Sequence, residues 1–151
     1  MVAFELETVV RAPPGRVFDV SLDIDVHQAS MQRSGERAVA GVTAGMIGLG
    51  ELVTWKARHF GITWTMTSRI AELQRPTRFV DEQVTGPFAS FRHVHQFTPD
   101  ADGTRMLDRV TFSAPLGPLG RLAERVVLAN HLRRLIVGRN AFVTAACEDP
   151  P

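Results

Sequence analysis

A histidine pair in the segment 86–97 is the feature of this sequence with the clearest chemical potential. The segment alternates like a β-strand, and successive strand residues point to opposite sides of a sheet, so Phe91, His93, His95 and Phe97 are predicted to share one face. That face holds two titratable rings, about 7 Å apart along the strand, within an aromatic frame. Such a mixture is typical of the lining of a ligand pocket.

Three roles are open to His93 and His95. Two imidazoles on one strand face can supply two ligands to zinc, iron or copper, and Asp108, Asp81 or Glu51 would then have to supply a third. A histidine beside Asp108 can instead form a general acid–base pair, in which the carboxylate holds the imidazole tautomer. The third role is that of cavity histidines that are hydrogen-bonded to carboxylates or water and catalyse nothing. We favour the third role and predict neither a bound metal nor a cofactor.

Two tryptophans extend the predicted lining. Trp55 and Trp64 lie on neighbouring predicted strands, and each is large enough to form a cavity wall. The chain contains no tyrosine, so any proton transfer must rest on histidine, acidic side chains and arginine. If the protein is an enzyme, we expect His93, His95 and Asp108 to be its catalytic residues. The predicted ligand-binding set is Trp55, Trp64, Asp81, Phe91, His93, His95, Phe97 and Glu51.

The elements that must position these residues can be predicted from hydrophobic periodicity and from the turn residues between them. One short helix begins at Pro13 or Pro14, a second spans residues 24–30, and a long helix runs without interruption over 117–146. Short connections favour antiparallel neighbours among the strands. The pattern predicts an α+β fold in which a curved, seven-stranded antiparallel sheet surrounds the long helix and leaves a hollow beside it. The predicted strands are 2–11, 36–41, 51–60, 62–71, 78–85, 89–99 and 104–114.

Length and composition narrow the classes of protein. The 151 residues suit one domain spanning 1–151. The net charge is +1 without blocks of like charge, so no nucleic-acid partner is predicted. The lone Cys147 cannot form an internal disulfide, which is compatible with a reducing compartment, and we expect the cytoplasm. We expect neither export nor a transmembrane segment, because no signal-peptide pattern and no run of about eighteen apolar residues occurs.

The last predicted helix carries more basic than acidic side chains. We expect this face to be solvated, in preference to a site for an anionic membrane or an acyl-carrier partner. A homodimer, formed through this face or through an edge of the sheet, stays open. The basic residues are Arg121, Arg125, Arg133, Arg134 and Arg139.

Several short motifs occur in a specific order along the chain: Ala12-Pro13 with Val17-Phe18, the segment 50–55, Pro76 with Phe79-Val80-Asp81, Gly86-Pro87-Phe88, the run 91–97, Gly103-Thr104 with Met106 and Asp108, and Pro115-Leu116-Gly117. This order resembles the SRPBCC or START-like superfamily and, within it, the polyketide cyclase/dehydrase-like group, over nearly the whole chain. The resemblance implies a helix-grip fold and a cavity under the C-terminal helix that binds a hydrophobic small molecule. Members range from lipid and hormone carriers to aromatase/cyclases, so the fold alone does not name an activity.

We therefore expect a carrier or sensor of a small hydrophobic molecule, such as a lipid. Aromatic residues would form the walls, and His93, His95 and Asp108 would orient the polar end of the ligand. The alternative is an enzyme similar to a polyketide cyclase/dehydrase, in which His93 or His95 is the base and Asp108 or Asp81 orients it.

Overall fold

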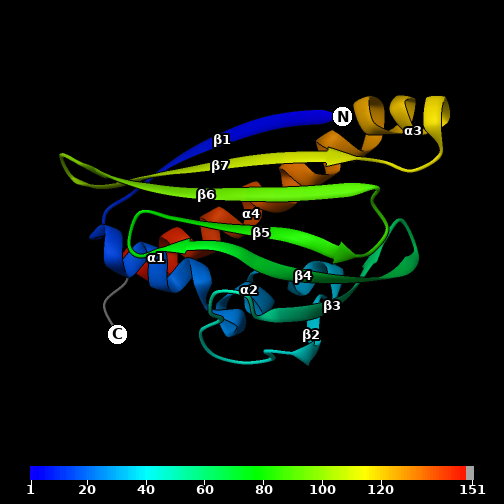
Figure 1. Cartoon of the computed structure of the whole chain (residues 1–151). Helices are drawn as coiled ribbons and strands as arrows, with labels where there is room; N and C mark the ends of the chain where they lie inside the picture. Colours follow the sequence, from blue (N-terminus) through cyan, green and yellow to red (C-terminus); the bar gives the residue numbers. More distant parts are fainter. Residues whose placement is uncertain (149–151) are drawn as a thin grey trace.

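A computed structural model of the chain describes residues 1–148. Seven antiparallel strands form one curved sheet, and the C-terminal helix lies along its concave side (Figure 1). The predicted α+β helix-grip architecture is thereby confirmed. The strands are β1 (Val2–Val10), β2 (Arg37–Gly41), β3 (Leu52–His59), β4 (Ile62–Gln74), β5 (Arg78–Thr85), β6 (Ser90–Asp100) and β7 (Gly103–Ser113).

The strand order is β1-β7-β6-β5-β4-β3-β2, so β5, β6 and β7 lie side by side. The register places Asp81 opposite His93 on the pair β5–β6, and His95 opposite Asp108 on the pair β6–β7. Directly opposed residues of an antiparallel pair point to the same face of the sheet. Four polar side chains from three strands therefore meet on the concave side.

Two short helices cover one end of that concave side. Helix α1 (Pro14–Leu22) has proline in its first turn, and helix α2 (Ile24–Ser30) is capped by Asp23, whose carboxylate accepts a 3.1 Å hydrogen bond from the Val26 N–H. A short 3-10 turn, η1 (Gln32–Ser34), leads into β2. The Phe18 ring of α1 packs edge-on against Phe79 at 5.5 Å and Phe97 at 5.4 Å. This end of the sheet is thus filled with hydrophobic core.

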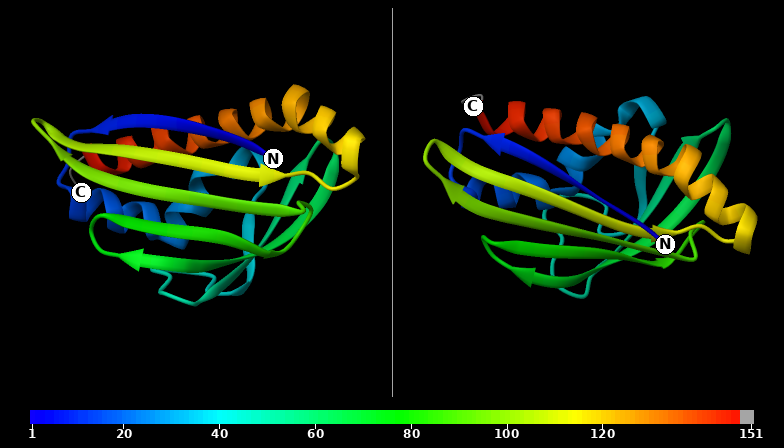
Figure 2. Two further views of the ribbon diagram at one scale, coloured as in Figure 1. Left: turned by 45° about the horizontal axis from the view of Figure 1, so that its top comes forward. Right: turned by 90° about the horizontal axis from the view of Figure 1, so that it is seen from above.

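The last helix differs from the prediction of one uninterrupted element. It consists of α3 (Gly117–Ala123), a π-helical turn η2 (Glu124–Leu128) and α4 (Ala129–Glu148). Helix α3 projects beyond the end of the sheet (Figure 2), so its apolar side chains Leu119 and Leu122 are 75% and 63% exposed. Within residues 1–148, no helix combines the length and the apolar character needed to cross a membrane.

Candidate functional site

A cavity of about 180 Å³ lies between the concave face of the sheet and helix α4. Its lining is mainly apolar and includes Trp55, Phe79, Phe91 and Leu132. Polar side chains gather at one part of the wall, where β5, β6, α1 and α4 approach one another. These are Ser21, Asp81, His93, His95 and Arg139.

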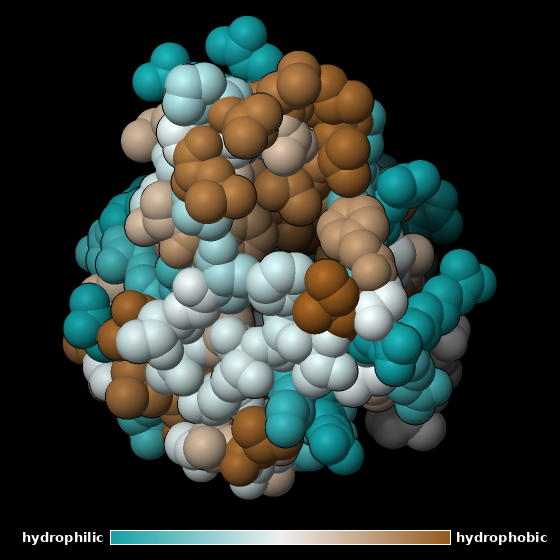
Figure 3. All heavy atoms as spheres, turned by 90° about the vertical axis from the view of Figure 1, so that its right-hand side faces the viewer, coloured by the Kyte–Doolittle hydropathy of each residue, from teal (hydrophilic) through white to brown (hydrophobic). Residues whose placement is uncertain are grey.

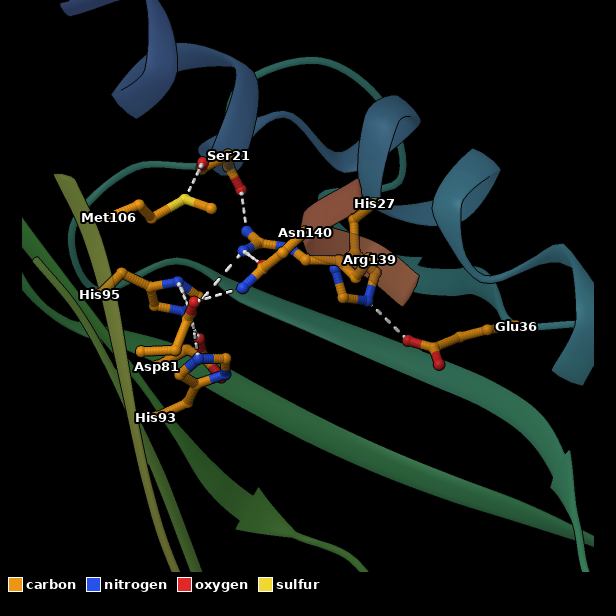
Figure 4. Close-up of polar contacts among 10 residues, drawn as sticks. Ser21, His27, Glu36, Asp81, His93, His95, Met106, Arg139 and Asn140 are labelled. Carbon is orange, nitrogen blue, oxygen red and sulfur yellow. Dashed lines mark hydrogen bonds and ion pairs between the residues drawn. The ribbon is translucent and has the colours of Figure 1, made fainter. Parts of the chain in front are cut away.

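His93, His95, Arg139 and Asn140 come together in one polar cluster (Figure 4), and the residue that all four contact is Asp108. Its side chain is completely buried. Nε2 of His93 lies 2.7 Å from Oδ1 of Asp108, and Nδ2 of Asn140 donates to Oδ2 at 2.7 Å. Arg139 is a third neighbour, with Nη1 at 3.7 Å from Oδ1. A buried carboxylate requires such compensation, because removal from water disfavours its charged form.

His95 occupies the position between the two carboxylates. Its Nε2 lies 2.8 Å from Oδ2 of Asp81, while its Nδ1 lies 3.4 Å from Oδ1 of Asp108 and forms no hydrogen bond within the described chain. The ring stacks between Phe79, at a centroid distance of 4.0 Å, and His93, at 3.8 Å. Both faces of the His95 imidazole are therefore covered.

The buried cluster shifts the pKa values of its members. Burial raises the pKa of the Asp108 carboxyl, but the hydrogen bond from His93 and the neighbouring His95 outweigh burial, so its pKa lies well below the usual range. Burial raises the pKa of Asp81, but the hydrogen bond to His95 and the charges of the nearby histidines together outweigh burial, so this pKa is also lowered. Burial and the adjacent His95 lower the pKa of His93 in spite of Asp108. At neutral pH the arrangement is an ionised Asp108 beside a neutral His93.

This charge state fixes the tautomer of His93. An ionised carboxylate can only accept hydrogen bonds, so Nε2 of the neutral His93 must carry the proton that it donates to Asp108. Nδ1 is then left with an unshared electron pair. Because His93 lines the cavity, Nδ1 is able to accept a hydrogen bond or a proton from a ligand.

Asp81, His93 and His95 also form a group whose potential metal-ligating atoms all lie within 4.8 Å of one another. The orientation of the rings does not suit a shared ion, since imidazole lone pairs lie in the ring plane. The two ring planes are stacked 3.8 Å apart and inclined by only 21°, so their lone pairs do not converge at the 2.0–2.1 Å distance of a zinc–nitrogen bond. A metal would require one ring to rotate away from its carboxylate.

Among the residues predicted for the site, Trp55, Asp81, Phe91, His93 and His95 line the cavity together. Asp108 contacts both histidines from behind.

Three predicted positions lie elsewhere. Phe97 is 2% exposed and packs in the core, because Phe18 of α1 fills the space beside it. Trp64 lies on the same face of the sheet as Trp55 but near the start of β4, beside the β3–β4 hairpin, where it lines a second pocket. Glu51 precedes β3, is exposed, and folds back to accept a 2.7 Å hydrogen bond from the Gly48 N–H.

Two residues of the cluster are not among the predicted site residues. Arg139, predicted to lie on a solvated basic face, is 3% exposed and donates to the backbone carbonyl of Ser21 at 3.1 Å. Asn140, for which the sequence analysis makes no prediction, donates to Asp108. Helical spacing from the buried Ile136 and Val143 places both residues on the inward face of α4. This periodicity was available in the sequence.

His27 is a further residue near the cavity. Its Nε2 lies 2.7 Å from Oε1 of Glu36, and its ring lies 4.5 Å from that of Trp55. Both His27 and Glu36 line the cavity, so a polar contact between α2 and the loop before β2 forms part of the wall.

Comparisons with known proteins place this geometry in context. A family model described as polyketide cyclase/dehydrase and lipid transport matches residues 1–147. No curated protein sequence matches the chain significantly.

Similar solved structures share the fold at low identity. The Zhui aromatase/cyclase from Streptomyces sp. R1128 is 20% identical, with a TM-score of 0.77 over 97% of this chain and 93% of that chain. TTHA0849 from Thermus thermophilus is 21% identical, with a TM-score of 0.75 over 96% of this chain and 99% of that chain. The major latex-like protein 151 from Panax ginseng is 12% identical, with a TM-score of 0.66 over 98% of both chains.

Proposed function

The chain belongs to the polyketide cyclase/dehydrase and lipid transport family, and from this premise we propose that its cavity binds a small, mainly apolar molecule that carries a carbonyl or hydroxyl oxygen. The oxygen lies against the polar wall, and the apolar body lies against the aromatic side chains. The protein then acts as a carrier or sensor of this molecule.

The observation that carries the proposal is the position of the buried polar cluster. Asp108, Arg139 and Asn140 place charges and hydrogen-bonding groups in the interior. Replacement of such buried groups by packed apolar side chains is often neutral or stabilising, so stability alone does not account for their presence. Asp108 in turn holds His93 at the wall of a mainly apolar cavity. Strongly perturbed pKa values inside a cavity are typical of functional sites.

A pair of ligands with matched shapes tests this arrangement. p-Cresol and p-xylene differ only by a hydroxyl in place of a methyl group, and an aromatic ring of this kind suits a cavity somewhat larger than the roughly 150 Å³ that holds benzene. A hydroxyl that donates to Nδ1 of His93 contributes about 1 kcal/mol, so p-cresol should bind roughly fivefold more tightly by calorimetric titration. His93→Phe should remove this preference, whereas His27→Phe, at another part of the wall, should keep it.

Failure of both compounds to bind, together with the absence of any apolar compound in native mass spectra of freshly purified protein, would contradict the proposal. Equal affinities for p-cresol and p-xylene would contradict the role of His93.

A catalytic function is the second candidate, and the fixed tautomer of His93 favours it. In an aldol closure, Nδ1 would take a proton from the carbon beside a ligand carbonyl, and the resulting enolate would form one carbon–carbon bond to a second carbonyl. The proton would then return to the new alkoxide, so the step needs no oxidant. Asp108 would hold the ring and stabilise the transient imidazolium. Loss of turnover in a folded His93→Phe variant would support this function, and an unchanged rate would exclude this mechanism.

A further inference from the structure

A second pocket, of about 300 Å³, lies beyond the outer end of the cavity. It is formed by α3, the start of α4, the β3–β4 hairpin and the turn between β5 and β6. Its walls are almost entirely apolar, with Phe60, Trp64, Pro87, Leu116 and Leu119 among them. Figure 3 shows apolar side chains gathered at this end of the molecule.

Two residues, Phe88 and Leu132, line both pockets. Phe88 lies in the β5–β6 turn, which Gln83 holds by donating to the Phe88 carbonyl at 2.8 Å and accepting from its N–H at 3.2 Å. Its ring packs against Phe91 at 5.3 Å. The two pockets therefore adjoin at Phe88 and Leu132, and rotation of a side chain is faster than movement of a strand.

The volumes indicate that the cavity alone is a small site. Pockets for cofactors and drug-sized ligands usually have volumes of about 300–1,000 Å³, and the cavity with its 180 Å³ lies below this range. Addition of the second pocket brings the total well into the range.

We propose that the second pocket binds the distal, apolar part of the same ligand, so that the ligand is an elongated amphiphile whose oxygen lies at His93 and whose tail passes between Phe88 and Leu132. This inference rests on the function proposed above and specifies the class of ligand. It also gives a role to the apolar side chains of α3 that extend beyond the sheet.

The polar groups of the second pocket indicate that the tail is uncharged. Among the lining residues whose side chains the structure describes, His59 and His131 are the titratable ones, and they face each other, with Nε2 of His131 at 3.0 Å from Nδ1 of His59. Burial lowers the pKa of both, so the pair is neutral at pH 7 and one imidazole donates to the other. Among the described residues, Glu36, from the loop before β2, acts on His59, and Arg134, which lies on α4 like His131, acts on His131.

The two tryptophans of the chain report the two pockets separately, since Trp55 lines the cavity and Trp64 lines the second pocket. The variants Trp64→Phe and Trp55→Phe each retain one of these fluorophores, and no tyrosine contributes background. The probes are 1-hexanol and 1-dodecanol. We expect hexanol to change only the emission of Trp55, and dodecanol to change the emission of both tryptophans.

Affinity gives a second readout. Each methylene that leaves water for apolar surroundings increases affinity by about fourfold, so burial of even three further methylenes in the second pocket gives dodecanol an advantage of about sixtyfold. Ala123→Phe, which fills the second pocket, should reduce the affinity for dodecanol to nearly that for hexanol. Ala145→Phe, at an exposed position of α4 outside both pockets, is the matched control and should change neither affinity.

The outcomes separate this inference from the proposed function. If Trp55 responds to both alcohols and Trp64 to neither, the inference is wrong while the proposed function stands. If neither tryptophan responds to either alcohol, both are wrong. A response of Trp64 alone would make the second pocket a separate site. A change in Trp64 emission with protein concentration alone would assign the second pocket to contact with a second copy of the chain. Either result overturns the inference.

Discussion

Asp108→Asn is the substitution that tests most directly whether a buried charge organises the site. The carboxylate is completely buried, accepts hydrogen bonds from His93 and Asn140, and lies 3.7 Å from the guanidinium of Arg139, which is itself 3% exposed. An amide at this position has the same shape but no charge. It would leave Arg139 as a buried cation without a carboxylate, and its NH2 group would oppose one of the two former donors.

The expected cost follows from these contacts. Removal of one partner from a buried ion pair costs about 3–5 kcal/mol, which is a large part of the roughly 5–15 kcal/mol by which a domain is stable. Asp81→Asn is the matched control. The Asp81 side chain is 25% exposed and has one hydrogen bond to His95, so its substitution should cost only about 1–2 kcal/mol.

Urea denaturation at pH 7.5, followed by circular dichroism, measures both costs. A double-mutant cycle with Arg139→Met then isolates the coupling between the charges, because methionine removes the cation. We expect a coupling energy of about 2–3 kcal/mol between Asp108→Asn and Arg139→Met. A cost below about 1 kcal/mol for Asp108→Asn, or additive effects in the cycle, would refute the idea that the Asp108 charge compensates Arg139.

Three further predictions concern pH and backbone geometry. The pKa values of Asp108 and Asp81 are lower in the folded than in the unfolded chain, so the stability that these carboxylates contribute is present above about pH 4 and is lost as the pH falls through their folded-state pKa values. Between pH 7 and pH 2, the urea midpoint should therefore fall less steeply for Asp108→Asn than for the unchanged protein. Parallel curves for the two proteins would contradict this prediction. Because the pKa of His93 is lowered, its Nδ1 stays unprotonated at neutral pH, and the preference for p-cresol over p-xylene should be lost only below about pH 6.5. Calorimetry that found the preference lost already at pH 7.5 would count against this protonation state of His93. Gly41 and Gly45 have nearly equal φ values of 72° and 70°, but a Cβ at Gly41 would lie 2.2 Å from the Leu52 carbonyl oxygen, whereas a Cβ at Gly45 meets nothing within 4 Å. Alanine should therefore lower the free energy of unfolding by about 1–2 kcal/mol at Gly45 and by a further 1–3 kcal/mol at Gly41. Equal urea midpoints for the two variants would show that the β2–β3 backbone moves to remove the clash.

The sequence predicts one half of the polar cluster more firmly than the other. Strands β6 and β7 are joined by the two residues Ala101 and Asp102, and this tight hairpin sets Asp100 opposite Gly103. Counting five residues back along β6 and five forward along β7 then places His95 opposite Asp108. The pairing of Asp81 with His93 depends on the longer β5–β6 connection, and loop length does not fix a register there. Irregularities elsewhere in the sheet, such as the shift between Ile70 and Glu72, add to this uncertainty of register.

Helix α4 limits prediction for a different reason. Periodicity identifies its inward face, but an arginine on a helix is usually solvated, and composition alone favours that interpretation for Arg139. The inward orientation is only favourable because Asp108, Ser21 and Asn140 supply partners for the guanidinium. The first two of these partners belong to a strand and a helix far away in the sequence, so the compensation is visible only in the folded chain.

The two histidines that look equivalent in the sequence have different surroundings in the fold. His95 has both ring faces covered, by Phe79 and His93, and its Nε2 contacts Asp81. Its contribution is to support the His93 ring and to separate two carboxylates. His93 has one face on His95 and one nitrogen on Asp108, and it lines the cavity, where the proposed function assigns its second nitrogen to the ligand. Recognition or proton transfer should therefore depend on the chemistry of His93, whereas His95 should be replaceable by a ring that preserves the stack.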